Sequence, residues 1–219
     1  MTPVNSEPVI ETRQLTKRYG RFTALDNLDL RVEPGTLFGF IGPNGAGKTT
    51  TLRMLAGLLE PTSGQISLHG QDISRDVTAA RWLVGYMPDF FGVYEDMKVW
   101  EYLDFFARCY RLDPAQRNRV VNELLELVDL ASRRDAWVES LSRGMRQRLC
   151  LAHALVHDPQ ILLLDEPASG LDPRARIEIR ELLKELSNLG KTIIISSHIL
   201  SELAEMCNQV GIIEHGRLL

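Results

Sequence analysis

The chain has 219 residues, 44% of them apolar, and a formal net charge of −4. This length predicts one domain with a sizeable core, and the slightly acidic balance lacks the basic field of a nucleic-acid-binding protein, so no nucleic-acid partner is expected. No apolar run reaches the length of a membrane span, the first residues lack the pattern of a secretory signal, and three scattered cysteines predict free thiols and a reducing cytoplasm.

The first part of the chain predicts strands followed by a strand–loop–helix unit. Residues 8–34 suggest short strands separated by turns, and residues 36–42 form an apolar run ending in glycine, typical of a buried strand. A glycine-rich loop follows, and residues 48–60 place apolar side chains on one helical face. Residues 63–70 predict another short strand between glycines.

The middle of the chain predicts helices. Residues 99–156 are mostly helical in pattern, and residues 117–131 carry one apolar stripe. The stripe consists of Val120, Leu124, Leu127 and Val128. Strands return with residues 160–167.

The last part predicts a helix, a strand and a hairpin. Asp172 is the expected N-cap of the helix, Pro173 its first residue and Gly190 the residue past its end. Residues 191–198 predict a strand, and residues 208–219 a closing hairpin. Strand–helix alternation at both ends of the chain predicts an α/β fold with a parallel sheet covered by helices, into which the helical middle is inserted.

Residues 42–50, "GPNGAGKTT", match the phosphate-loop pattern G-x-x-x-x-G-K-[ST]. The glycines let successive N–H groups point at phosphate oxygens, and the helix that follows adds the positive end of its dipole. Lys48 is expected to reach the β- and γ-phosphates, and the Thr49 hydroxyl to ligate Mg²⁺. A glycine-rich turn with a chance Lys-Thr is the alternative, which the buried strand and amphipathic helix around the loop disfavour. The loop residues expected to contact ATP are Gly42, Pro43, Asn44, Gly45, Ala46, Gly47, Lys48, Thr49 and Thr50.

Two acids at the end of the apolar run 161–164 are candidates for metal binding and catalysis. Because side chains alternate along a strand, Asp165 and Glu166 face different directions. Asp165 is expected to hold Mg²⁺ through its water shell, and Glu166 to polarise the attacking water. A solvated acidic strand end is the alternative. His198, at the end of the later strand, is expected to sense the γ-phosphate, although a lone His at a strand end is more often structural.

These motifs, in this order, resemble those of the ATP-binding cassette (ABC) ATPases over essentially the whole chain. Tyr19 lies where the family stacks an aromatic ring on adenine, and residues 42–50 match Walker A. Residues 141–149, "LSRGMRQRL", fall at the signature motif. Asp165 matches Walker B and Glu166 the catalytic glutamate, while residues 169–172, "SGLD", match the D-loop and His198 the switch histidine.

The resemblance implies a phosphate-loop (RecA-like) parallel-sheet core with an N-terminal antiparallel β subdomain and an inserted helical subdomain. Residues 1–219 would be one ABC ATPase domain, with the core in 1–87 and 157–219 and the helical subdomain in 88–156. ATP and Mg²⁺ are the implied cofactors. Dimerisation head to tail, with itself or a homologous ATPase subunit, is implied as well, the signature of one subunit covering the ATP of the other. The residues expected to contact the partner's ATP are Ser142, Arg143, Gly144, Met145 and Asp172.

The sequence departs from the family pattern at two places. In the signature, Arg143 replaces a glycine and Met145 a glutamine; Arg143 either lies alongside the phosphate or points to solvent. Asp89 stands where the family usually has a glutamine that touches Mg²⁺, so it is assigned to the metal site, with a plain loop cap as the alternative. Both patterns resemble the branch that serves two-subunit export permeases. Many members of that branch continue past the last predicted strand, so a shortened chain is expected.

The function implied is an ATP-hydrolysing subunit at the cytoplasmic face of the cell membrane, powering a separate integral membrane permease, with export favoured. A soluble ABC ATPase acting on ribosomes or nucleic acid is the alternative; such relatives usually carry two cassettes or long coiled-coil inserts, and this chain has one Walker A and no heptad run. A non-hydrolysing regulatory module is disfavoured by intact Lys48, Glu166 and His198. Ordinary phosphate-loop kinases and GTPases lack the signature and D-loop. The transported substrate is not readable, since its contacts lie in the permease.

Overall fold

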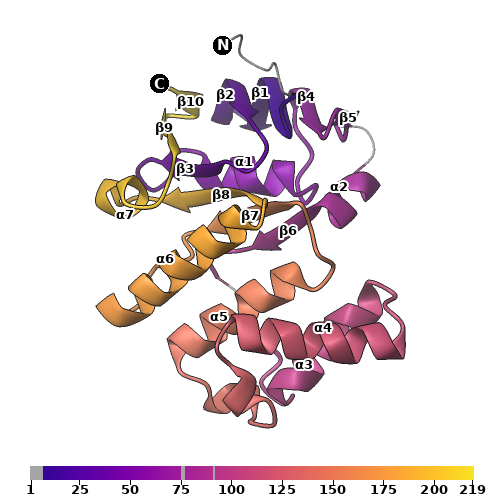
Figure 1. Ribbon diagram of the computed structural model, residues 1–219. Coiled ribbons are helices and arrows are strands. Elements are labelled where there is room, and N and C mark those ends of the chain that lie inside the picture. The colour runs from indigo at the N-terminus through magenta and orange to yellow at the C-terminus, as the bar shows by residue number, and fades with distance from the viewer. Residues whose placement is uncertain (1–6, 75–76, 91) are drawn as a thin grey trace, which may run out of the picture.

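The computed structural model describes residues 7–74, 77–90 and 92–219 as two sheets and a set of helices (Figure 1). Residues 1–6, part of the N-terminal segment that lacks a secretory signal pattern, lie outside the described residues, as do residues 75, 76 and 91. A four-stranded antiparallel sheet has the order β2-β1-β4-β5. Its strands are β1 (Ile10–Tyr19), β2 (Phe22–Val32), β4 (Ser63–Leu68) and β5 (Gln71–Asp72).

The second sheet has six strands in the order β10-β9-β3-β8-β7-β6. Its strands are β3 (Leu37–Ile41), β6 (Val84–Met87), β7 (Ile161–Asp165), β8 (Thr192–Ser197), β9 (Gln209–Glu214) and β10 (Arg217–Leu218). All neighbouring pairs are parallel except β9 and β10, which form the closing hairpin. The predicted α/β class, parallel core sheet and N-terminal antiparallel sheet are therefore confirmed.

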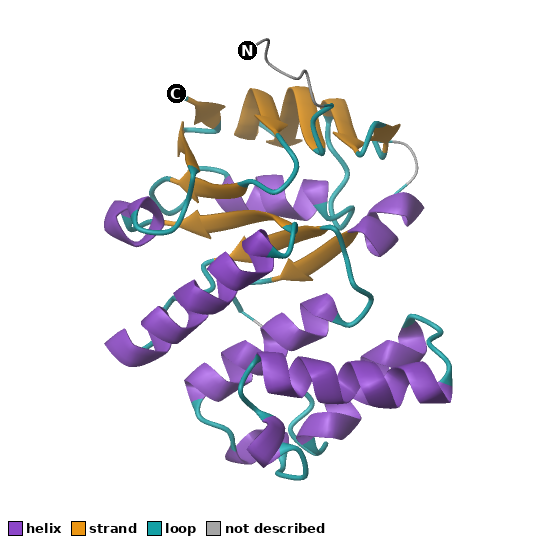
Figure 2. Cartoon of the chain, in the orientation of Figure 1, coloured by secondary structure: helices purple, strands orange, loops and turns teal. Residues whose placement is uncertain are grey.

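The helices lie around the parallel sheet and in a separate lobe, the lower part of Figure 2. The α-helices are α1 (Lys48–Leu55), α2 (Thr78–Leu83), α3 (Val99–Cys109), α4 (Pro114–Leu127), α5 (Arg143–Leu155), α6 (Pro173–Asn188) and α7 (Leu200–Ala204), and the short 3₁₀ helices are η1 (Ala131–Arg133) and η2 (Val138–Ser140). Among the described residues no helix is long and apolar enough to cross a membrane. The helical lobe comprises α3, α4 and α5; its proposed boundaries, 88–156, stay a prediction.

Side-chain alternation divides the core into two layers. On β7, Leu163 belongs to the layer that packs α1 between the two sheets, whereas Leu162 and Leu164 face the opposite layer, which contains α6 and the helical lobe. Strands buried on both faces read as continuous apolar runs, which is why the runs at 36–42 and 161–164 predicted strands correctly. The apolar side chains of α5 pack both against the lobe and against the parallel sheet, so this helix connects the lobe with the core.

Two helices differ from their predicted extents. α1 ends at Leu55 rather than continuing to residue 60, because Gly57 adopts a left-handed φ of 68° that ends the helix. α4 begins at Pro114, where the Asp113 side chain accepts hydrogen bonds from the next turn. The predicted stripe faces the core: Leu124 and Val128 are buried, and Val120 and Leu127 are partly buried against the same cluster. Val121 and Leu125 extend the buried face.

Two histidine rings fix the C-terminal end of α5. The ring of His153 stacks on Phe106 of α3 with centroids 3.6 Å apart, and that of His157 stacks on Tyr110 at 4.0 Å. The Nε2–H of His157 donates to the Val84 carbonyl over 3.1 Å. Burial, together with the nearby His157, lowers the pKa of His153 to about 4, and burial lowers the pKa of His157 to about 4. Both rings are therefore neutral at pH 7.

Candidate functional site

The phosphate loop connects the buried strand β3 to the N-terminus of α1. Gly47 precedes the helix with a left-handed φ of 110°, and a Cβ there would lie 2.8 Å from the Ala24 carbonyl oxygen. A side chain would therefore meet both backbone strain and a steric conflict, which accounts for glycine at this position. The first turn of α1 leaves backbone N–H groups free to bind an anion.

Lys48 folds back over this loop and is only 6% exposed. Its Nζ donates to the carbonyl oxygens of Gly42 at 2.6 Å and Pro43 at 3.3 Å, and it lies 3.5 Å from Oε1 of Glu166. The ammonium group is thus surrounded by oxygen atoms of the protein. Phosphate oxygens can take the place of these acceptors, since a buried ammonium needs compensating acceptors of some kind.

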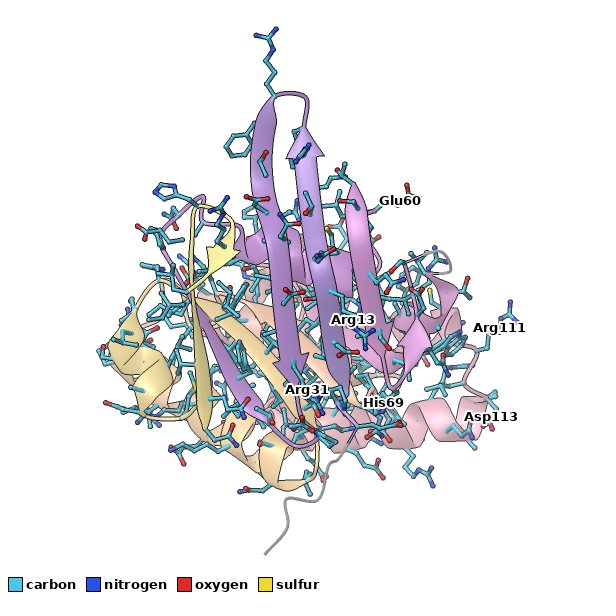
Figure 3. The ribbon with its side chains drawn as sticks, turned by 90° about the horizontal axis from the view of Figure 1, so that it is seen from above. Arg13, Arg31, Glu60, His69, Arg111 and Asp113 are labelled. Carbon is cyan, nitrogen blue, oxygen red and sulfur yellow. The ribbon has the colours of Figure 1, made fainter. Side chains whose placement is uncertain are left out.

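A cleft of about 250 Å³ opens over the loop. It brings together all the predicted nucleotide-loop residues except Gly42, together with Tyr19, Asp89, Asp165 and Glu166. Phe22 and Ala24 also line it, and the sequence reasoning missed both. Tyr19 and Phe22, which are 50% and 63% exposed, flank the tip of the β1–β2 hairpin. This hairpin projects beyond the body of the molecule in Figure 3, where Arg13 and Arg31 mark the outer face of its sheet. Exposed rings beside a phosphate loop offer a surface on which a planar base can stack.

Asp165 presents one carboxylate oxygen to a neighbouring strand and leaves the other without a partner. Its Oδ1 accepts a 2.5 Å hydrogen bond from the Ser196 hydroxyl on β8, while the buried Oδ2 has no hydrogen-bond partner among the described residues. Buried polar atoms are rarely left unsatisfied, so this oxygen is suited to a metal-bound water. No group of three or more His, Cys, Asp or Glu side chains in the described ranges forms a metal cage, so the site fits a cation such as Mg²⁺ that retains waters and phosphate ligands.

Glu166 follows β7 in a left-handed conformation, with φ of 51°. Its backbone N–H donates to Ser196, to the hydroxyl at 3.0 Å and to the carbonyl at 3.2 Å. The side chain reaches His198, whose Nδ1 lies 2.9 Å from Oε2. Ser196 therefore positions both acids, a role that the sequence reasoning missed; the run Ser196-Ser197-His198 after an apolar strand was the available signal.

A second cleft, of about 350 Å³, lies at the N-termini of α5 and α6. It is lined by Ser142, Arg143, Gly144, Met145 and Asp172, the predicted trans contacts, and by Gly170. Ser142 caps α5 by accepting from the Met145 N–H at 3.3 Å, and Asp172 caps α6 by accepting from the Ala175 N–H at 3.0 Å, as predicted. Two helix N-termini at one cleft favour an anion. Among the described residues, the two clefts share no lining side chain.

Arg143 is exposed at this second cleft and also contacts its own chain. It turns toward its own D-loop, where Nη2 donates to the Ser169 carbonyl oxygen over 3.1 Å. Arg146, three residues along the same helix, bonds instead to the Leu141 carbonyl and pairs with Glu95 at 3.3 Å. The guanidinium of Arg143, the residue before Gly144, is thus hydrogen-bonded to the protein itself.

Comparison with known proteins places these features in a family. The family described as "ABC transporter" matches residues 25–169. The chain is 47% identical over 209 residues to a protein of Cupriavidus metallidurans named Nod factor export ATP-binding protein I, covering 95% of this chain and 69% of that protein. A protein of the same name from Paraburkholderia xenovorans is 46% identical over 211 residues, covering 96% and 69%.

Solved structures give the same result. The chain superimposes on a structure described as the ATP-binding subunit of an ABC transporter with a TM-score of 0.85 and 31% identity, covering 96% of this chain and 88% of that one. The TM-score to cbiO1 from Clostridium perfringens, part of the ABC transporter complex cbiONQ, is 0.88 at 28% identity, with 98% and 88% covered.

Proposed function

The chain belongs to the ABC transporter family as an ATP-binding subunit with ATPase activity coupled to transport, and from this premise we propose that two subunits close head to tail over two ATP molecules to drive export through a separate integral membrane permease. The observation that carries the proposal is that the phosphate-loop cleft and the signature cleft share no lining residue within the described ranges. One chain thus offers two half-sites that a second copy, or a homologous subunit, can complete.

The phosphate-loop cleft holds the nucleotide in this proposal. Tyr19 stacks on the adenine, with Lys17 Nζ 5.3 Å from the centroid of its ring, and the loop N–H groups surround the phosphates. Lys48 exchanges the carbonyls of Gly42 and Pro43 for β- and γ-phosphate oxygens. The Thr49 hydroxyl, Asp165 and Asp89 would hold Mg²⁺, which supplies positive charge to the phosphates when it is bound.

Hydrolysis falls to Glu166 and His198. When phosphate draws Lys48 away, the Glu166 carboxylate is released to accept a proton from the attacking water. His198, 2.9 Å from Oε2, holds that carboxylate in place and faces the γ-phosphate. In the partner subunit's site, Ser142 and the N–H of Gly144 contact the γ-phosphate from the opposite side, and Met145 and Asp172 complete that surface.

Direction and location follow the relatives. Proteins more than 45% identical are named for Nod factor export, so we assign the chain to an exporter, at the cytoplasmic face of the membrane and attached through the permease. Residues 1–87 and 157–219 form the nucleotide-binding part, and residues 88–156 are the helical lobe that faces the permease.

Replacing the proposed base tests the assignment. Glu166→Gln keeps the size of the side chain and its contact with His198 but removes the proton acceptor. We expect ATP binding to persist, steady-state hydrolysis to fall by roughly 10²–10⁴-fold, and a dimer to accumulate with ATP in light scattering. Glu214→Gln, an exposed change on β9, is the matched control and should hydrolyse normally. Wild-type turnover by Glu166→Gln would refute the assignment of the base, and monomers at saturating ATP would refute the dimer.

A further inference from the structure

The signature helix is anchored to the D-loop of its own chain. Besides its 3.1 Å hydrogen bond to the Ser169 carbonyl oxygen, the guanidinium of Arg143 lies against Gly170, so close that a Cβ at position 170 would overlap it. Gly170 also has a left-handed φ of 67°. Glycine at 170 therefore leaves the space that the Arg143 side chain occupies.

A second anchor lies one helical turn further along α5. Gln147 is a buried polar residue, 3% exposed, and its Nε2 donates to the Pro167 carbonyl oxygen. Residues i and i+4 share a helix face, so Arg143 and Gln147 hold alternate carbonyls of the segment that follows Glu166. Gly144 lies between these anchors, and a Cβ there would be 3.7 Å from Leu171 and 3.5 Å from Ala175, so α5 and the start of α6 are in close contact.

We propose that Arg143 and Gln147 are positioning residues that lock the start of α5 to residues 167–171 of the same chain, so that the surface covering the partner's ATP moves as one unit with the chain's own Glu166. This inference rests on the proposed head-to-tail dimer. When the lobe shifts toward the partner's phosphate, the hydrogen bonds to the Pro167 and Ser169 carbonyls move the segment that directly follows Glu166. Closure of one ATP site is thereby transmitted to the base of the other.

An arginine is required at position 143 because of its shape. A planar guanidinium can lie flat against the Cα of Gly170 while one N–H reaches a carbonyl, whereas the tetrahedral ammonium of lysine offers a point charge on a flexible stem. We therefore expect Arg143→Lys to restore part of the function that Arg143→Ala loses. If only the positive charge at position 143 mattered, Arg143→Lys would restore the function in full.

The first experiment compares Arg143→Ala with Arg174→Ala by amide hydrogen exchange in the nucleotide-free subunit. Both residues line the second cleft, but Arg174 pairs with Glu178 of its own helix. The reporters are the amides of Ser169 and Leu171, which bond to the carbonyls of Glu166 and Ala168. We expect exchange about fivefold faster in Arg143→Ala, the size of effect expected for losing one hydrogen bond of ordinary net strength, since this bond is exposed. Exchange in Arg174→Ala should match the wild type. Unchanged exchange in Arg143→Ala would overturn the lock.

The second experiment measures hydrolysis. In Arg143→Ala the ATP concentration for half-maximal hydrolysis should rise about fivefold, while the affinity of the isolated subunit for ATP, measured by calorimetry, stays at the wild-type value. Gly170→Ala should displace the guanidinium and act similarly. Its additional effect should be smaller in the Arg143→Ala background, where the strain of alanine at a left-handed φ remains but no guanidinium is left to displace. Strictly additive effects would overturn the contact. Faster amide exchange in Arg143→Ala with an unaltered ATP dependence of hydrolysis would overturn the coupling between the two sites but not the contact itself. The proposed dimer is tested separately, by Glu166→Gln.

Discussion

Glu166 is contacted at both carboxylate oxygens, by Lys48 at Oε1 and by His198 at Oε2. The lysine and the glutamate that the proposal assigns to successive steps thus neutralise each other before nucleotide arrives. A phosphate anion competes for the same ammonium group, and a buried pair responds strongly to such an exchange because the charges are poorly solvated. Binding the substrate and freeing the base are therefore linked through one side chain.

Ser196 provides the residue-scale prediction. Ser196→Ala removes the 2.5 Å donor to Asp165 Oδ1 and one acceptor of the Glu166 N–H. Hydrogen bonds to charged groups contribute about 1.5–3 kcal/mol, so hydrolysis should fall by roughly 10–100-fold and the Mg²⁺ concentration for half-maximal activity should rise. Magnesium titrations of ATPase activity measure both.

Its neighbour Ser197 is the control. The Ser197 hydroxyl accepts from the Ile199 N–H at 3.0 Å and lies 3.5 Å from Glu202, so it supports the start of α7 and leaves the acids untouched. Ser197→Ala should preserve the magnesium dependence. An identical response from the two serine variants would mean that Ser196 supports the strand end rather than Asp165.

The sequence predicts the two acids but not the groups that contact them, and the reason is distance along the chain. The phosphate loop, residues 42–50, is one continuous run of sequence, and Asp165 and Glu166 are neighbours in another. Local pattern and spacing therefore predict both. The bonds from Ser196 to Asp165 and from Arg143 to Ser169 join residues 31 and 26 positions apart. Only the packing of β8 beside β7, and of α5 beside the D-loop, brings those groups together.

At the scale of elements, α5 carries the signature at one end, and two neutral, partly buried histidines lie near its other end, His153 on the helix and His157 just past it. The Nδ1 of His157 is buried with no hydrogen-bond partner in the described part of the chain. Protonation would place an N–H there without an acceptor, which agrees with a pKa lowered to about 4 from the ordinary 6.5. Protonating either ring therefore favours separation of α5 from α3 and β6.

This predicts a pH dependence of stability. Between the unfolded value of 6.5 and the folded value of about 4, the unfolded chain binds more protons, so the free energy of unfolding falls as pH drops through that window and levels off below it for these two groups. Urea denaturation in steps from about pH 7.5 to 4 measures the slope.

A non-titrating pair of residues isolates the effect. In His153→Leu combined with His157→Gln, the chain loses both rings but keeps an apolar contact at 153 and an amide donor for the Val84 carbonyl, so the slope above pH 4 should become shallower even if overall stability falls. His215→Gln, at a side chain that is 94% exposed, should keep the wild-type slope. A slope unchanged in the double variant would locate the pH dependence in the carboxylates.

Element boundaries were less predictable than element types. Runs buried on both faces predicted β3, β7 and β8, and the Asp172-Pro173 pair predicted the start of α6 at the observed residue. The same cap-and-proline signal at Asp113-Pro114 was not used, although it marks the start of α4. The stripe predicted for α4 does face the core, but the buried face also includes Val121 and Leu125, because the packing of α3 and α5 against α4 sets how wide that face is.

At the scale of the whole molecule, two half-sites on one chain predict complementation. Ser142→Arg places a long cation at the signature cleft, and Lys48→Ala removes the phosphate-loop charge, so each subunit alone should be nearly inactive. A mixed dimer contains one composite site with an intact phosphate loop from the first subunit and an intact signature from the second. Partial ATPase activity should return on mixing, up to about a quarter of wild type if chains pair at random and sites act independently.

Two controls make the mixing experiment decisive. Ser142→Arg subunits should bind ATP with wild-type affinity, because Ser142 lies outside the phosphate-loop cleft. Ser140→Arg, a change two residues earlier at an exposed position, should hydrolyse ATP when tested alone. Full activity of unmixed Ser142→Arg would exclude the head-to-tail arrangement.

Separating the phosphate loop from the signature has a kinetic consequence for the cell. If every working site requires two chains, the hydrolysis rate of dilute subunits rises with the square of their concentration and becomes linear only once pairing is saturated. A free subunit then hydrolyses almost no ATP. A permease that holds two subunits side by side raises their effective concentration to the millimolar range typical of tethered partners. ATP consumption would accordingly follow the number of assembled transporters rather than the number of subunits synthesised.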